Sequence, residues 1–242
     1  MSDPRFGSAA RARVLLAATV LVPALALLPY GGWLVGFVAP LTVLGWFRRR
    51  VRFGDHLGAW AIGMTWAGLL SLGVVLLVYL APESAVAGIV NGEPYREEMF
   101  GWIATGEGAE VTPGVFVPQH LLHLGLFLLL TWASGGYLGL VLGALLVAYM
   151  SAFVGSYALE VEALVLGPVV AWVPWSVLRV AAFVLLGVVF TKPLLVRRVW
   201  PFGRQEHVLL LLALSGIVGD LALKTLAAPA YGVFLRHFGG GL

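Results

Sequence analysis

Long apolar runs separated by short polar connections dominate the pattern of this chain. A helix that crosses the roughly 30 Å hydrocarbon core of a membrane needs about 20 apolar residues, and runs near that length recur throughout. The pattern predicts an all-α polytopic bundle of about seven transmembrane helices, or six plus a re-entrant pair at the N-terminus. The expected segments are residues 13–30, 32–47, 57–80, 115–134, 136–158, 164–191 and 207–227.

Two of these segments contain residues that interrupt helices. The second carries Gly31, Gly32, Gly36 and Pro40, so it is either a full span or a re-entrant arm folded back on the first segment. The sixth carries Pro174, which we expect to kink the helix and expose backbone carbonyls at membrane depth.

Composition supports the membrane interpretation. The chain is 60% hydrophobic and 11% charged, with a mean hydropathy of +0.96, which leaves too little polar surface to coat a water-soluble globule. We therefore expect one integral membrane domain over residues 1–242, with an acidic outer loop at about 81–114. The absence of cysteine excludes disulfides, thiolate metal sites and cysteine nucleophiles.

Charge is distributed unevenly between the connections, and cytoplasmic connections of membrane proteins are enriched in arginine and lysine. We therefore predict a bacterial plasma membrane protein with a cytoplasmic N-terminus, retained as a signal anchor, and an external C-terminus. The net charge of +3 has the same origin and does not indicate nucleic-acid binding. The bases are Arg5, Arg11, Arg13, Arg48, Arg49, Arg50, Arg52, Lys192, Arg197, Arg198 and Arg204, and the opposing acids are Glu83, Glu93, Glu97, Glu98, Glu107, Glu110, Glu160 and Glu162.

Small residues recur every four positions at the start of the fifth segment, at Gly135, Gly139 and Gly143. Such a glycine ribbon lets another helix approach closely, which is a main source of helix association in lipid. The neighbour is either another helix of this chain or a second copy or membrane partner.

The acidic loop contains the sequence NGEPYREEMFGW, in which Pro94 can begin a helix. Its apolar and aromatic residues fall largely on one side, so we expect a short helix in the outer membrane interface. This helix is either a cover over the bundle or the carrier of a working glutamate, Glu97 or Glu98.

His120 and His123 lie three residues apart at the start of the fourth segment and therefore on one helical face. Two imidazoles at this spacing can share a divalent metal such as zinc, with Glu97 or Glu98 completing a three-ligand catalytic set. The alternative is a pair of interfacial histidines bonded to water or backbone.

Arg179 lies near the middle of the sixth segment, where an unpaired guanidinium costs several kcal/mol. Asp220 in the seventh segment is the best candidate partner. Lys224 competes for Asp220 from one turn away, which would leave Arg179 to carbonyls, an outer glutamate or an anionic substrate. The alternatives are a structural ion pair and a substrate or proton site.

Two fragments resemble pieces of the glutamic intramembrane proteases of the CAAX-processing type: the adjacent glutamates of YREEMFGW, and the spacing from Phe116 to His120 in FVPQH. They cover under a tenth of the chain. The arginine four residues after the glutamate pair and the later histidine with asparagine that this family has are absent here, so the chain is not assigned to it.

Three functions follow from these residues. The first is a membrane-embedded enzyme that acts on a lipid or peptide through His120, His123 and a glutamate, with or without a metal. The second is a transporter or channel subunit that uses Arg179 and Asp220. The third is a non-catalytic assembly subunit that contacts partners through its outer loop and glycine ribbon.

Overall fold

The computed structural model describes residues 9–200 and 202–240, and every regular element in that part of the chain is a helix. The expected all-α fold is confirmed. The α-helices are α1 (Ala9–Leu21), α2 (Gly31–Val38), α3 (Leu44–Arg52), α4 (His56–Leu80), α5 (Pro82–Gly88), α6 (Gly92–Thr105), α7 (Pro113–Ser134), α8 (Tyr137–Glu160), α9 (Leu166–Ala171), α10 (Pro174–Val196) and α11 (Arg204–Phe238), and the 3-10 helices are η1 (Val22–Leu27), η2 (Ala39–Thr42) and η3 (Ala109–Val111).

Among the described residues, five helices are long and apolar enough to cross a membrane: α4, α7, α8, α10 and α11. They correspond to the third to seventh expected segments. Only 22% of the most apolar stretch of α7 and of α11 is buried inside the protein, although both are strongly apolar. Such exposed apolar surface is what a helix presents to lipid.

The first two expected segments are shorter helical pieces instead. The apolar stretches Arg13–Leu27 and Gly31–Thr42 each span about 20 Å, less than the hydrocarbon core. The chain reverses between them at Tyr30, whose backbone is left-handed with φ 58°, and α2 packs back against η1.

The sixth expected segment is also divided. Trp172 and Val173 leave helical geometry, so α9 ends at Ala171 and Pro174 occupies the first turn of α10. The expectation of a kink inside one helix was wrong, because a proline is best accommodated where its missing N–H has no helical partner.

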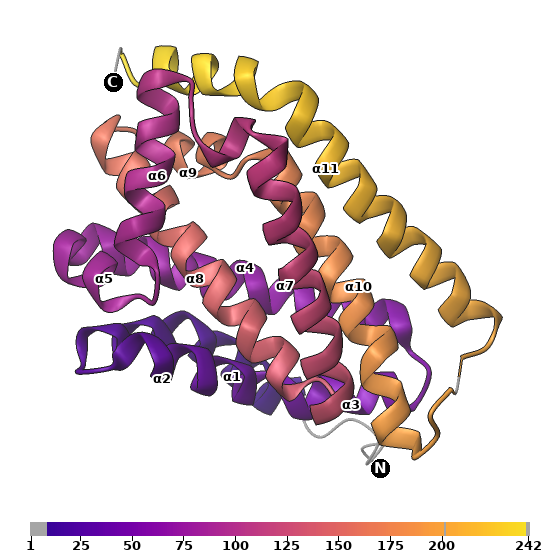
Figure 1. Ribbon diagram of the computed structural model, residues 1–242. Helices are drawn as coiled ribbons and strands as arrows, with labels where there is room; N and C mark the ends of the chain where they lie inside the picture. Colours follow the sequence, from indigo (N-terminus) through magenta and orange to yellow (C-terminus); the bar gives the residue numbers. More distant parts are fainter. Residues whose placement is uncertain (1–8, 201, 241–242) are drawn as a thin grey trace.

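Charged residues collect at opposite ends of the bundle (Figure 1). Helix α3 and the α10–α11 connection, which carry arginines, lie at one end of the bundle, whereas α5, α6, α9 and the last turns of α11 lie at the other. The acidic residues Glu83, Glu93, Glu97 and Glu98 belong to α5 and α6. Arg5 lies outside the described residues, as does the side chain of Arg11.

Helix α8 runs through the middle of the bundle and packs against α4, α7 and α6. Two glycines of its ribbon, Gly135 and Gly139, lie against other parts of this chain: a Cβ at Gly139 would lie 1.9 Å from Thr131 Oγ1 of α7. The third, Gly143, faces open space. Gly135, at the turn before α8, has a left-handed backbone with φ 58°. Contact with a second copy through these glycines stays a prediction.

The acidic loop between α4 and α7 forms the short helix expected from its sequence, α6. Met99, Trp102 and Ile103 of α6 are buried, and they join the hydrophobic cluster that includes Phe153 and Tyr157 of α8. Helix α11 continues to Phe238, well past the expected end at residue 227, and its last turns contact α6 and accept a 2.8 Å hydrogen bond from the Tyr157 hydroxyl at the Leu235 carbonyl. The far end of α11 thus holds the acidic loop against the bundle.

The contact of α1 with α4 depends on Gly73, and Gly73→Ala tests it. A Cβ at Gly73 would lie 2.3 Å from the Val20 carbonyl oxygen, so we expect a loss of about 1–3 kcal/mol in the free energy of unfolding. The matched control is Gly68→Ala in the same helix, where a Cβ meets nothing within 4 Å. Thermal unfolding midpoints in detergent measure both; equal midpoints would contradict the packing of α1 on α4.

Candidate functional site

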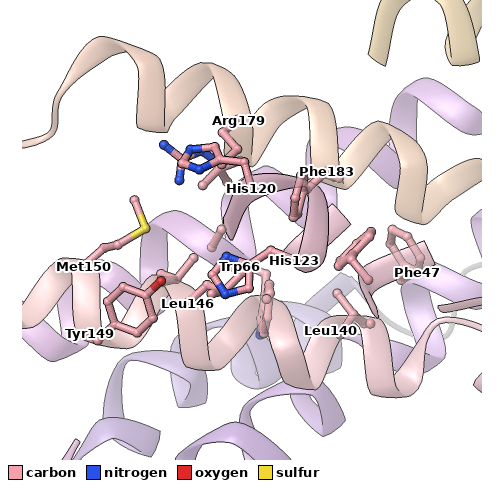
Figure 2. Close-up of a pocket in the computed structure, with 17 residues that line it drawn as sticks. Phe47, Trp66, His120, His123, Leu140, Leu146, Tyr149, Met150, Arg179 and Phe183 are labelled. Atoms are coloured by element: carbon pink, nitrogen blue, oxygen red, sulfur yellow. The ribbon is translucent and has the colours of Figure 1, made fainter. Parts of the chain in front are cut away.

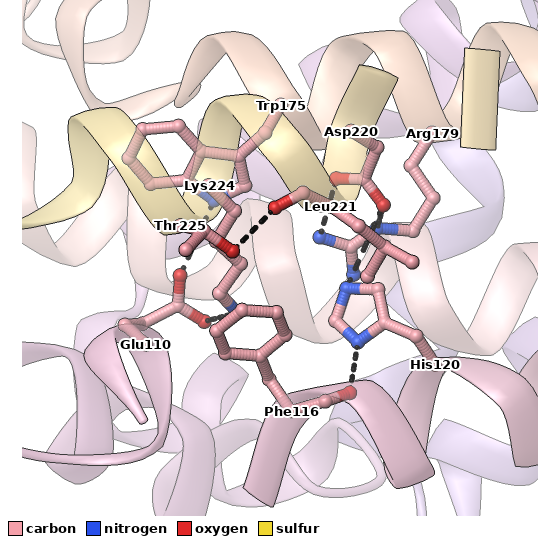
Figure 3. A network of polar contacts seen from close by, with 9 residues as sticks. All are labelled: Glu110, Phe116, His120, Trp175, Arg179, Asp220, Leu221, Lys224 and Thr225. Carbon is pink, nitrogen blue, oxygen red and sulfur yellow. Dashed lines mark hydrogen bonds and ion pairs between the residues drawn. The ribbon is translucent and has the colours of Figure 1, made fainter. Parts of the chain in front are cut away.

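Buried charged side chains from four elements meet in the interior of the bundle (Figure 3). Helix α7 supplies His120, α10 supplies Arg179, α11 supplies Asp220 and Lys224, and η3 supplies Glu110. All but Arg179 are less than 9% exposed. The network therefore consists of groups that need protein partners, because little solvent reaches them to stabilise their charge.

Arg179 and Asp220 form a two-point ion pair between α10 and α11. Arg179 Nε lies 3.0 Å from Asp220 Oδ2, and Arg179 Nη2 lies 3.3 Å from Oδ1. Asp220 is completely buried. Asp220 is the partner expected for Arg179, because an unpaired guanidinium at this depth is costly. The two-point contact between the guanidinium and the carboxylate fixes both side chains.

Lys224 pairs with Glu110 and not with Asp220. Its Nζ lies 2.8 Å from Glu110 Oε1 and 4.6 Å from the centroid of the Phe116 ring. The indole N–H of Trp175 donates to Glu110 Oε2 over 3.3 Å. Sequence reasoning counted Glu110 among the outer acids and missed this role, because Glu110 and Lys224 are 114 residues apart.

His120 lies between the Arg179–Asp220 pair and the start of α7. Its Nδ1 is 2.7 Å from the Phe116 carbonyl oxygen, and a carbonyl only accepts, so Nδ1 carries a proton. In the neutral ring, Nε2 then holds the lone pair. Nε2 is buried and has no hydrogen-bond partner among the described residues, although Asp220 Oδ2 lies 3.7 Å away.

A small cavity of about 60 Å³ borders this network (Figure 2). His120, His123, Tyr149 and Arg179 are its polar lining, and the remaining lining side chains are apolar. One water molecule needs roughly 10–15 Å³ of such space, so the cavity can hold several. Arg179 bonds Asp220 through Nε and Nη2, so Nη1 is the nitrogen left over from that pair.

The glutamates of α6 lie beside the network and do not line the cavity. Partial burial raises the pKa of Glu98, the neighbouring Glu110 carboxylate raises it further, and Lys224 opposes both. Burial also raises the pKa of Tyr95, with Glu110 as the next contribution. Glu97 on the same turn is exposed, and Glu98 also keeps much of its surface exposed.

The expected three-ligand metal site is not assembled. Among the described residues, no three His, Asp or Glu side chains lie close enough together to hold a metal ion. His120 and His123 both face the cavity, but Glu97 and Glu98 do not join them. The backbone bond of His120 Nδ1 instead matches the alternative interpretation of these histidines.

A second buried cluster lies at the opposite end of the bundle. His56 Nε2 is 3.0 Å from Glu206 Oε1, Lys192 pairs with the same carboxylate, and the Gly203 N–H donates to Oε2 over 2.8 Å. Sequence reasoning missed this cluster as well. Glu206 sits three residues after Gly203 in a helix-capping position, and that spacing was the available signal.

No protein-family model matches this chain, and no curated protein or solved structure is found to be similar to it. What the site can do must therefore be argued from its own geometry.

Glu110→Gln should destabilise the protein by about 3–5 kcal/mol, because it leaves the buried Lys224 ammonium without a counter-charge. Adding Lys224→Met removes that charge and should restore most of the loss. Thermal unfolding in detergent measures both variants. The control is Glu83→Gln, which removes an exposed partner of Arg96 and should change little. A double variant no more stable than Glu110→Gln would contradict the pairing.

Glu98 should make stability depend on pH. An acid whose pKa is raised by folding favours the folded state fully below its unfolded pKa of about 4.3 and loses that contribution as pH rises through the folded pKa. Glu98→Gln should therefore gain stability relative to the parent as pH rises from 4 upward, measured by thermal unfolding. Glu97→Gln makes the same charge change one residue away. Identical profiles for the two variants would contradict the effect of burial and Glu110 on Glu98.

Proposed function

We propose that this chain is an integral membrane enzyme that hydrolyses an ester or amide carbonyl of a lipid or peptide, with His120 as the general base. The observation that carries the proposal is the unpartnered Nε2 of buried His120 beside a small cavity. A buried polar atom without a partner costs free energy, so its retention favours a role that a bound reactant fulfils.

The reaction that fits these groups begins with a water molecule in the cavity. His120 Nε2 takes one proton from it, and the oxygen attacks the substrate carbonyl carbon to give a tetrahedral oxyanion. Arg179 Nη1 is the cationic donor available to that oxygen. When the bond to the alcohol or amine breaks, the imidazolium returns its proton to that leaving group, so the enzyme ends unchanged.

Two neighbours prepare His120 for this work. The Phe116 carbonyl holds the proton on Nδ1 and thereby leaves Nε2 as the base. The Asp220 carboxylate, 3.7 Å from Nε2, would stabilise the imidazolium that forms. Asp220 is itself held by Arg179, so the position of its carboxylate is fixed by α10 and α11. His123 completes the polar lining of the cavity.

We infer that the basic end of the bundle is cytoplasmic and the acidic end external, in the plasma membrane of a bacterium. The arginines of α3 and of the α10–α11 connection support this orientation, because cytoplasmic connections retain basic residues. With five crossings, the N-terminus is inside and the C-terminus outside. The site then opens toward the outer half of the membrane, next to α6 and η3.

A transporter is the second candidate, and the four alternating charges of the Arg179–Asp220 and Lys224–Glu110 pairs favour it. Buried ion pairs that exchange partners can relay a proton. Acidification of vesicles that contain the purified protein, followed with an internal pH dye, separates this role from hydrolysis.

His120→Gln should lower hydrolytic turnover by about 10²–10⁴-fold, the usual contribution of a general base. The assay presents purified protein in vesicles with ester lipids and with apolar peptides, and mass spectrometry detects the released acid, alcohol or amine. His207→Gln is the matched control, because His207 makes the same 2.7 Å contact with a backbone carbonyl but is exposed at the other end of the bundle.

Turnover that survives His120→Gln would overturn the assignment of the base. Products absent from all substrates, combined with proton flux that Asp220→Asn abolishes, would favour the transporter instead.

A further inference from the structure

An apolar groove runs along the outside of the bundle between α4, α8, α9 and α10. Its volume is about 500 Å³, within the range of about 300–1,000 Å³ that small-molecule sites occupy. Leu72, Leu164, Val165 and Val177 on its rim are exposed, so the groove opens on surface that faces lipid in the proposed orientation.

The few polar groups in the groove already have partners inside the protein. The Trp172 indole N–H donates to Ser71 Oγ over 3.1 Å, Ser151 donates to the same oxygen over 2.9 Å, and the Tyr79 hydroxyl donates to the Leu164 carbonyl over 2.8 Å. A peptide segment would bring backbone N–H and C=O groups that this lining leaves unsatisfied. A hydrocarbon chain brings none.

The groove adjoins the cavity that contains His120. Ala67, Val147 and Val180 line both spaces, and Val180 directly follows Arg179 on α10. A chain lying in the groove therefore reaches the cavity across a partition of three apolar side chains. Gly68 lines the groove and Gly143 lines the cavity, and a Cβ at either position would meet nothing within 4 Å.

We propose that this groove binds the hydrocarbon chain of a lipid substrate and delivers its carbonyl to the cavity beside His120 and Arg179. The inference rests on the proposed hydrolytic function and names the substrate class for the same site. The polar side chains line the cavity, at the inner end of the path, and the apolar side chains line the groove, at the end that faces lipid. A lipid that enters headgroup region first from the side would match this order, with its carbonyl in the cavity and its hydrocarbon chain in the groove.

Photo-crosslinking tests the binding step without requiring turnover. The purified protein is placed in phosphatidylcholine vesicles doped with phosphatidylcholine that carries a diazirine near the carbonyl end of one acyl chain, and labelled residues are mapped by mass spectrometry. We expect labels on groove residues and also on residues that line the cavity, such as Met150 and Phe183. Both side chains are buried, so lipid that merely surrounds the protein should label them little.

Gly68→Leu should fill the groove and lower cavity labelling by about tenfold or more, the scale on which a filled apolar pocket rejects a chain. Gly125→Leu is the matched control, because Gly125 is an exposed glycine of α7 whose Cβ also meets open space. His120→Gln should retain the labelling, so loss of turnover and loss of lipid binding are separate results.

Two outcomes would overturn the inference whatever the activity of the protein. Labels confined to the exposed faces of α7 and α11 would show surrounding lipid only. Labelling of the groove and cavity by a diazirine-bearing apolar peptide, but not by the lipid, would assign the path to a peptide substrate.

Discussion

The rest of the structure depends on the need to neutralise charge where water is scarce. Four buried or half-buried charges form two pairs, Arg179 with Asp220 and Lys224 with Glu110. The first pair fastens α10 to α11 within the bundle. The second fastens η3, which belongs to the connection between α4 and α7, to α11. An ion pair removed from water adds little net stability beyond what an apolar pair would, but an unpaired member is strongly destabilising. The pairs therefore favour the arrangement of α10, α11 and η3 in which all four groups are matched.

His120, at the centre of the network, has a partner for only one of its two ring nitrogens. Its Nδ1 is matched by the Phe116 carbonyl, while Nε2 faces Asp220 at a distance beyond hydrogen-bond length. Both carboxylate oxygens of Asp220 are already committed to Arg179. Each charged side chain of the network thus has an oppositely charged partner. The neutral nitrogen His120 Nε2 is left as a free acceptor next to the cavity. The cluster at Glu206 also contains a histidine Nε2 without a hydrogen-bond partner, that of His56. It differs in that this atom lies only 3.0 Å from the carboxylate, which also pairs with Lys192 and accepts a backbone N–H as part of a helix cap.

Run length and hydropathy predicted α4, α7, α8, α10 and α11, because crossing a membrane imposes a length that a sequence displays directly. The Arg179–Asp220 pair was likewise predictable, since a guanidinium at mid-helix requires an acid and few acids lie within apolar segments. The partner of Lys224 was not predictable, because Asp220 one turn away offered a local solution and η3 has no periodic pattern that positions Glu110. The shortness of the α1–α2 hairpin depends on the reversal at Tyr30, and backbone conformation at a single residue is weakly encoded.

The geometry of α10 explains how one helix can serve both the charged site and the apolar groove. Successive residues of an α-helix point about 100° apart. Val177 lies on the rim of the groove, Arg179 lines the cavity, and Val180 borders both. Pro174 begins this helix one turn earlier, and the break at Trp172 lets that indole bond Ser71 across the groove instead of continuing the α9 helix. An unbroken helix from α9 into α10 would not place the Trp172 indole against Ser71. The interruption of the sixth segment therefore shapes the groove. It also sets the position of Arg179 at the inner end of the groove.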